Sequence, residues 1–226
     1  MLIEIAGLYI CSYLIGSVPT AYIVARVSRN IDIRDYGSGN VGASNAFRHL
    51  GKWPWIPLFL FDVLGKGSAP LLVGAHLLGL PLDSGILLGA PLFALAGHNW
   101  SVFLKFQGGR GVAVVVGSLA VLSPIVLAVS LVMVGIGWLL TRSSGVWVLI
   151  ALVLLPLWTV IARDPVVVTW YCVGALALVV SKRLLSNWTP LYPGLPKKKV
   201  LFNRLFLDRD VDDNAEWVHR SPRTSD

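Results

Sequence analysis

Long apolar runs alternate with short polar connections along most of this chain. Each run has about the length that a helix needs to cross the hydrocarbon core of a bilayer, roughly 20 residues. The first run contains Gly16-Ser17-Val18-Pro19, and a kink is expected there because proline interrupts helical hydrogen bonding. The pattern predicts an all-α, polytopic integral membrane protein with about seven transmembrane helices. The expected spans are residues 2–27, 55–80, 85–104, 111–122, 125–140, 145–162 and 166–181.

Composition supports the membrane class. The chain is 55% hydrophobic and only 14% charged, with a mean hydropathy of +0.71, which is too apolar for a soluble domain of this length. The net charge of +7 comes from basic residues between the apolar runs and near the C-terminus, where anionic lipid headgroups explain them, so no nucleic-acid partner is expected. Cys11 and Cys172 both lie inside apolar runs, so neither a disulfide nor a metal site is predicted.

The distribution of Lys and Arg gives the expected orientation. The basic stretch from residue 26 to residue 52 should be cytoplasmic and the N-terminus outside. Residues 111–140 fit either one long tilted helix or two short helices that separate at Ser123-Pro124. One helix would place Arg142 and the basic residues at 182–183 and 197–199 outside, whereas two helices place them in the cytoplasm. Because cations concentrate on the cytoplasmic side, we favour two helices and a cytoplasmic C-terminus. We therefore expect one membrane domain, residues 1–183, and a polar cytoplasmic tail, residues 184–226.

The first connection is rich in glycine. Gly37, Gly39 and Gly42 have the spacing of a dinucleotide-binding turn, but no strand pattern precedes them, so that interpretation is disfavoured. Such glycines still allow backbone amides to converge on an anion, and a short helix predicted over 43–50 would add its N-terminal dipole. The stretch thus predicts a phosphate site at the membrane surface, although an ordinary loop with interfacial cations remains an alternative. Its polar and basic candidates are Ser38, Asn40, Ser44, Asn45, Arg48 and Lys52.

A second glycine-rich connection on the same side strengthens this prediction. It follows His98 and contains Gly108, Gly109 and Arg110, so that two such loops could clamp two anionic groups. Asp62 and Lys66 lie four residues apart inside a predicted span, where ionisable groups are costly unless they are paired or functional. The pair is interpreted as either structural or functional. His98 is likewise either a buried hydrogen-bonding residue or a general base.

Three stretches carry a family resemblance: YGSGNVGASNAFRHLGK, FDVLGKG and GHNWSVFLKFQGGRGVA. They resemble the bacterial integral-membrane acyl-phosphate:glycerol-3-phosphate acyltransferases, whose first motifs read GSGNxGA(T/S)NxxRxxGK and GHxxPxFxxFxGGKG. The resemblance covers residues 13–124 with motifs and continues in hydropathy to 187. It implies a seven-span enzyme of the bacterial plasma (inner) membrane with its motif loops facing the cytoplasm. It also implies transfer of a fatty acyl group from acyl phosphate to the 1-hydroxyl of glycerol 3-phosphate, which forms lysophosphatidic acid for phospholipid biosynthesis without a metal or other cofactor.

The resemblance assigns roles to particular residues. Ser38, Asn40, Asn45 and Arg48 would line the phosphate site, and Arg110 replaces the lysine of GGKG. The hydroxyl proton would pass to the departing phosphate or to His98.

This chain also departs from the family pattern. Ser101 replaces a proline, and FDVLGKG has one residue more than FDxLKG, which should turn the Lys66 side chain by about 100° around a helix. The motif RHRENI is replaced by VSKRLLSNW, which has no His or Glu but offers Arg183, Ser186 and Asn187 as polar substitutes. The alternative function is therefore a non-catalytic relative that binds phosphorylated lipid precursors.

Overall fold

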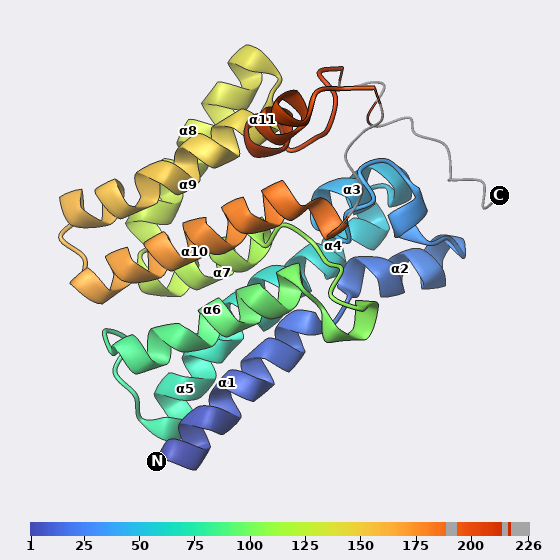
Figure 1. The fold of residues 1–226 in the computed structure, drawn as a ribbon. Coiled ribbons are helices and arrows are strands. Elements are labelled where there is room, and N and C mark those ends of the chain that lie inside the picture. The colour runs from blue at the N-terminus through green and yellow to red at the C-terminus, as the bar shows by residue number, and fades with distance from the viewer. Residues whose placement is uncertain (189–193, 214–216, 218–226) are drawn as a thin grey trace.

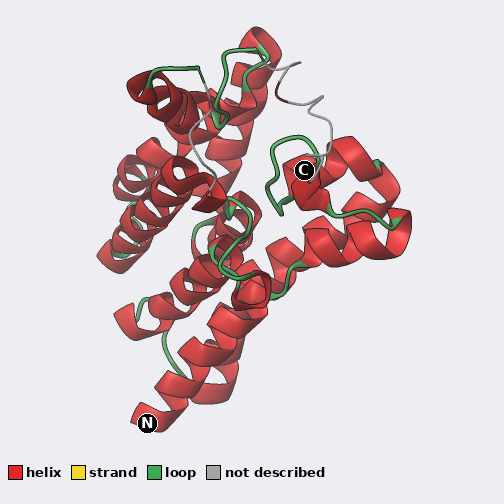
Figure 2. Cartoon of the chain, turned by 45° about the vertical axis from the view of Figure 1, so that its right-hand side comes forward, coloured by secondary structure: helices red, strands yellow, loops and turns green. Residues whose placement is uncertain are grey.

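The computed structural model describes residues 1–188, 194–213 and 217. Within these ranges the regular secondary structure is helical, with one isolated bridge between Ser101 and Gln107, so the predicted all-α class is confirmed (Figure 2). The first apolar run forms α1 (Leu2–Ser17) and α2 (Thr20–Arg29). The two helices meet at Val18 and Pro19, which confirms the predicted break.

The remaining helices follow in the order that the apolar runs predict. They are η1 (Ile33–Asp35), α3 (Ala43–Leu50), α4 (Lys52–Leu60), the π-helix η2 (Phe61–Ser68), α5 (Ala69–Leu78), α6 (Gly85–Asn99), η3 (Val102–Leu104), α7 (Val112–Leu122), α8 (Pro124–Thr141), α9 (Ser144–Ile161), α10 (Val166–Leu185), η4 (Ser186–Trp188) and α11 (Lys197–Leu207).

Among the described residues, five helical stretches are long and apolar enough to cross a membrane. They are Leu2–Arg29, Lys52–Leu77, Pro124–Thr141, Ser144–Ile161 and Val166–Leu185. The helices α6 and α7 are also apolar but shorter. The chain breaks at Ser123 between α7 and α8, so the two-helix interpretation of residues 111–140 is confirmed. Large apolar side chains on α8, such as Ile125 and Leu140, are exposed, as a lipid-facing surface requires.

Small residues bring the central helices close together. α1 packs along α6, α10 lies against both α6 and α9, and α7 packs against η2 (Figure 1). A methyl group at Gly16 would collide with the backbone of Ala94, and one at Gly117 would collide with the backbone of Val63. Such close approach is typical of helix packing in membranes, where apolar burial gives little driving force. This close packing places Asp62 and Lys66 of η2 and His98 of α6 beside the two glycine-rich connections.

The chain after α10 returns to the helical bundle. α11 packs against α9 and α10 (Figure 1). Arg183, buried near the end of α10, donates from Nη1 to the carbonyl oxygens of Gly145 at 3.0 Å and Leu205 at 2.8 Å. Residues 194–213 of the predicted polar tail are thus held against the membrane helices, whereas its parts at 189–193, 214–216 and 218–226 lie outside the described residues.

Candidate active site

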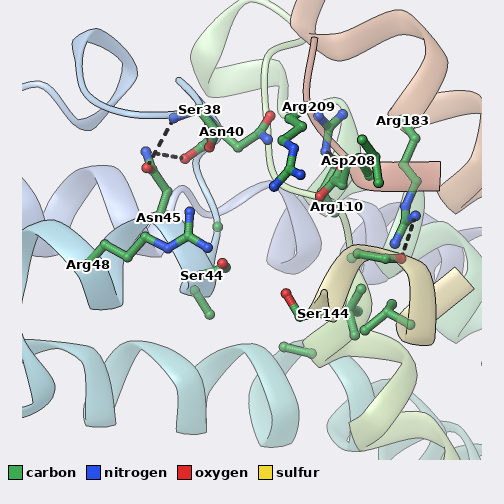
Figure 3. Close-up of a pocket in the computed structure, with 18 of the residues that line it drawn as sticks. Ser38, Asn40, Ser44, Asn45, Arg48, Arg110, Ser144, Arg183, Asp208 and Arg209 are labelled. Atoms are coloured by element: carbon green, nitrogen blue, oxygen red, sulfur yellow. Dashed lines mark hydrogen bonds and ion pairs between the residues drawn. The ribbon is translucent and has the colours of Figure 1, made fainter. Parts of the chain in front are cut away.

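A cavity of about 330 Å³ lies where the two glycine-rich connections, the first turn of α9 and the segment after α11 meet (Figure 3). Ten of the residues predicted from the sequence line it: Ser38, Asn40, Gly42, Ser44, Asn45, Arg48, Asp62, His98, Arg110 and Arg183. The other predicted residues are not among its lining residues: Gly37, Gly39, Lys52, Lys66, Gly108, Gly109, Ser186 and Asn187. The two loops that the sequence singled out are therefore adjacent in space and share one cavity.

Asn45 organises the first loop from inside. Its side-chain Nδ2 donates to the carbonyl oxygens of Ile33, Tyr36 and Asn40 at 3.0 to 3.2 Å, and its Oδ1 accepts from the amide of Ser38 at 3.4 Å. Gly37 lies within the same loop with a φ of 53°, a conformation that favours glycine. Because Asn45 is buried and its side-chain amide bonds to backbone groups of the loop, its main role is to fix the shape of the loop.

The helix α3 presents Arg48 to the cavity. The predicted helix over 43–50 is confirmed, and Gly42 precedes its first residue beside the cavity. Ser44 and Arg48 are four residues apart on this helix, so both side chains face the same space (Figure 3). Gly51, with a φ of 81°, ends the helix, and Lys52 starts α4 with its ammonium group 5.1 Å from the ring centre of Trp53. Arg48 and Lys52 therefore do not share a helix face.

The second loop is fastened to the first and to the end of α10. The amide of Val41 donates to the carbonyl of Gly108 at 3.3 Å. Asn187 brackets Gly108, accepting from its amide at 2.9 Å and donating to its carbonyl at 3.1 Å. A methyl group at Gly109 would collide with the His98 ring. The glycines of this loop thus permit close backbone approach.

Arg110 is a buried cation at the centre of the site. Its Nε lies 2.7 Å from Oδ1 of Asp208, and its Nη1 donates to the carbonyl of Lys182 at 2.6 Å. With its carbonyl oxygen turned to the guanidinium, Asn40 accepts from Nη2 of Arg110 at 3.1 Å. Burial lowers the pKa of Arg110, and the Asp208 carboxylate opposes that shift. Arginine stays protonated in proteins, so Arg110 supplies a fixed positive charge.

Asp62 and Lys66 form a buried pair beside the kink of the first span. Lys66 Nζ lies 2.7 Å from Oδ1 of Asp62 and donates to the Val18 carbonyl, also at 2.7 Å. The Thr20 hydroxyl donates to the same Asp62 oxygen at 2.6 Å. His98 Nδ1 lies 3.3 Å from Lys66 Nζ, which connects the pair to the cavity.

A π-helix contains the Lys66 motif. A π-turn has one more residue than an α-turn, and such turns are frequent at functional sites. η2 spans the FDVLGKG stretch, and from it Lys66 faces Asp62 and His98. The rotation of about 100° relative to FDxLKG stays a prediction.

Several cavity residues were missed in the sequence because they come from distant segments. They are Arg142, Ser143, Ser144, Asp208 and Arg209. Arg142 and Ser144 flank the turn between α8 and α9, where a polar Thr-Arg-Ser-Ser stretch between apolar runs was the available signal. Arg183, predicted as a substitute for the altered third motif, also lines the cavity. Nothing local marked Asp208 or Arg209 as functional.

The fold and site define an integral membrane protein whose polar cavity, lined by several arginines, suits phosphorylated ligands. Residues 6–192 match the model of the family described as glycerol-3-phosphate acyltransferase, and the chain belongs to that family. The chain is 37% identical to glycerol-3-phosphate acyltransferase 5 of Dehalococcoides mccartyi, over 94% of this chain and 91% of that protein. A match of that extent continues past residue 192.

Solved structures agree with the family assignment. The glycerol 3-phosphate form of PlsY (YgiH), an integral membrane glycerol 3-phosphate acyltransferase, superposes with a TM-score of 0.73 at 32% identity, covering 80% of this chain and 88% of that one. The lysophosphatidic acid form of the same protein gives a TM-score of 0.71 at 30% identity, with the same coverage. The chain is thus a membrane acyltransferase of this family.

Proposed function

We propose that this protein transfers a fatty acyl group from acyl phosphate to the 1-hydroxyl of glycerol 3-phosphate. The products are lysophosphatidic acid and inorganic phosphate. The observation that carries the proposal is the shared cavity, in which Arg48 of the first loop and Arg110 of the second face one space large enough for small phosphorylated groups. Membership of the glycerol-3-phosphate acyltransferase family supports the acceptor and the product.

The reaction needs positioning more than covalent help. The acceptor oxygen attacks the acyl carbonyl carbon, an ester bond forms, and the bond between that carbon and the phosphate oxygen breaks. Because the mixed anhydride is already activated, bringing the two substrates together and stabilising the oxyanion accounts for most of the acceleration. Arg48 and Arg110 are the charged groups that would bind the phosphates, with Ser38 and Asn40 as neutral partners.

The surroundings of His98 favour the departing phosphate as the proton acceptor. Lysine has donors only, so Lys66 donates to Nδ1 of His98 and the ring proton belongs on Nε2. A histidine in this form donates from Nε2 rather than accepting there. His98 is thus suited to hydrogen-bond an anionic oxygen, and the hydroxyl proton passes to the phosphate that leaves.

The proposed topology follows the charge pattern of the sequence. The five long apolar stretches, together with the shorter helices α6 and α7, would make seven crossings. The glycine-rich loops would then face the cytoplasm of a bacterium and the N-terminus the outside, as the concentration of cations between residues 26 and 52 favours. Both substrate phosphates would enter the cavity from the cytoplasm, with the acyl chain among the helices.

The decisive experiment measures transfer by the purified protein in lipid vesicles, with palmitoyl phosphate and labelled glycerol 3-phosphate. The native protein should form lysophosphatidic acid, and Arg48→Ala should lose the activity. Arg29→Ala is the matched control, because Arg29 is exposed at the end of α2 and is not among the cavity-lining residues. Folded native protein that binds glycerol 3-phosphate without forming product would refute the enzyme and support the non-catalytic relative.

A further inference from the structure

The segment that follows α11 contributes to the cavity although it lies past residue 192, where the family match ends. Leu207, Asp208 and Arg209 are all lining residues. Asp208 and Arg209 approach from the side opposite to Arg48, so the cavity is closed by a part of the chain that lies beyond the family model (Figure 3).

The segment is held in place by buried contacts. Arg204 of α11 pairs with Asp210, Nε to Oδ1 at 2.7 Å, and both side chains are almost fully buried. Arg204 also donates from Nη1 to the carbonyl of Leu184 near the end of α10 at 3.1 Å. Asn203 donates to the Asp210 carbonyl at 3.3 Å. These contacts fix the backbone on both sides of Asp208 and Arg209.

The first turn of α9 is shaped to admit this segment. A Cβ atom at Gly145 would lie 2.6 Å from the carbonyl oxygen of Leu207, so any larger residue there would push the segment out. Gly145 is itself a cavity-lining residue. The close fit joins the segment to the wall that also carries Ser144.

The two charged residues have different surroundings. Asp208 lies 2.7 Å from Nε of Arg110, whose side chain is 9% exposed, and this pair fixes the direction of the guanidinium. Arg209 donates from Nε to the backbone carbonyl of Val211 at 3.1 Å and from Nη2 to the backbone carbonyl of Asp212 at 2.7 Å. Its guanidinium is directed into the same space as Arg48 (Figure 3).

Two like charges that face one cavity favour an anion between them. Burial lowers the pKa of Arg209, the negative charges of Asp212 and Asp213 raise it, and the positive charge of Arg48 lowers it. A bound phosphate would relieve this repulsion and accept charge-assisted hydrogen bonds from both guanidinium groups.

We propose that Asp208 is a positioning residue for Arg110 and that Arg209 binds a substrate phosphate from the side opposite to Arg48. The proposal deepens the proposed function and rests on it for the identity of the substrates. The phosphate belongs either to acyl phosphate or to glycerol 3-phosphate. Separate Michaelis constants for the two substrates distinguish these sources.

The test compares Arg209→Gln and Asp208→Asn in the full-length protein in lipid vesicles. Arg209→Gln should raise KM for one of the two substrates about tenfold with little change in kcat, as expected for one lost hydrogen bond from a charged group. Arg209→Lys should recover part of the affinity. Asp208→Asn should lower kcat, because Arg110 loses its orientation. Asp208→Glu should recover part of the lost kcat.

A matched control removes a charge from the same part of the chain without touching the cavity. Lys198→Gln removes an exposed cation from α11. It should leave KM and kcat unchanged. A purely structural role would lower the melting temperature of the variants but leave KM in Arg209→Gln and kcat in Asp208→Asn at the native values, which would overturn the proposal.

A binding readout separates this proposal from the proposed enzymatic function. Inorganic phosphate should raise the melting temperature of the native protein in detergent, and Arg209→Gln should reduce that rise. If the native protein shows no transfer but is stabilised by phosphate in an Arg209-dependent manner, the enzymatic function fails and the phosphate role stands. Equal stabilisation of both proteins, or no stabilisation of the native protein, overturns the role of Arg209.

Discussion

Removing one partner of the buried pair between Asp62 and Lys66 should destabilise the protein severely. Both side chains are 1% exposed, and the charged atoms are 2.7 Å apart. In Asp62→Asn the Lys66 ammonium keeps the Val18 carbonyl and the Thr20 hydroxyl as acceptors but loses its counter-charge. Breaking a buried pair in this way costs about 3–5 kcal/mol. For a chain of this size, each kcal/mol corresponds to a decrease of roughly 2–4 °C in melting temperature.

The assay is thermal unfolding in detergent of the native protein, Asp62→Asn, Lys66→Gln and the double variant. The double variant should be more stable than either single variant, because neither charge is then left alone in the bundle. Asp212→Asn is the control, since its pair with Lys199 is exposed and contributes at most about 1 kcal/mol. A loss in Asp62→Asn no larger than in this control would refute the reasoning, and so would additive losses in the double variant.

The other predictions concern the two loops. Gly109→Ala should abolish transfer in the vesicle assay, because its methyl group would collide with the His98 ring, and native turnover would show that the loop tolerates displacement. Asn187→Ala should lower kcat at least tenfold while the melting temperature falls by only a few degrees, because the variant loses both hydrogen bonds to the Gly108 backbone. An unchanged kcat would show that these two hydrogen bonds do not position the loop for catalysis. The hydrogen bond from Arg34 lowers the pKa of Asp32 in the folded protein. The ionised carboxylate therefore stabilises the folded state above the unfolded pKa of about 3.9, and this stabilisation is lost as pH falls through the folded pKa. Melting temperatures measured from pH 6 to pH 3 should therefore fall less in Asp32→Asn than in the native protein, and parallel curves would contradict it.

Much of the fold could be predicted because each membrane helix appears in the sequence as one continuous apolar run. A run of apolar residues of sufficient length has few alternatives to a buried or lipid-facing helix. The break at Ser123 was decided by charge rather than by periodicity, since residues 111–140 are apolar throughout. The kink at Pro19 followed from backbone chemistry alone.

The site was predictable only where its residues are close together in the sequence. The glycines and cations of each loop form a local pattern, and a loop that converges on an anion needs that pattern. Asp208 reaches Arg110 across a long sequence separation, and no local periodicity carries information about such a pair. The contribution of the segment after α11 thus depends on how α11 packs on α9 and α10, which is a property of the folded bundle.

Lys66 shows how the contacts of a motif residue depend on the packing of several helices. Asp62 and Lys66 are four residues apart, a spacing that keeps two side chains on one face of a regular helix. The backbone here widens to a π-turn over Phe61–Ser68 and returns to α-helix at Ala69. Within this turn Lys66 also reaches the carbonyl of Val18 at the kink and Nδ1 of His98 in α6. Its pairing with Asp62 could thus be predicted from the spacing, whereas its contacts with Val18 and His98 arise from how three helices pack.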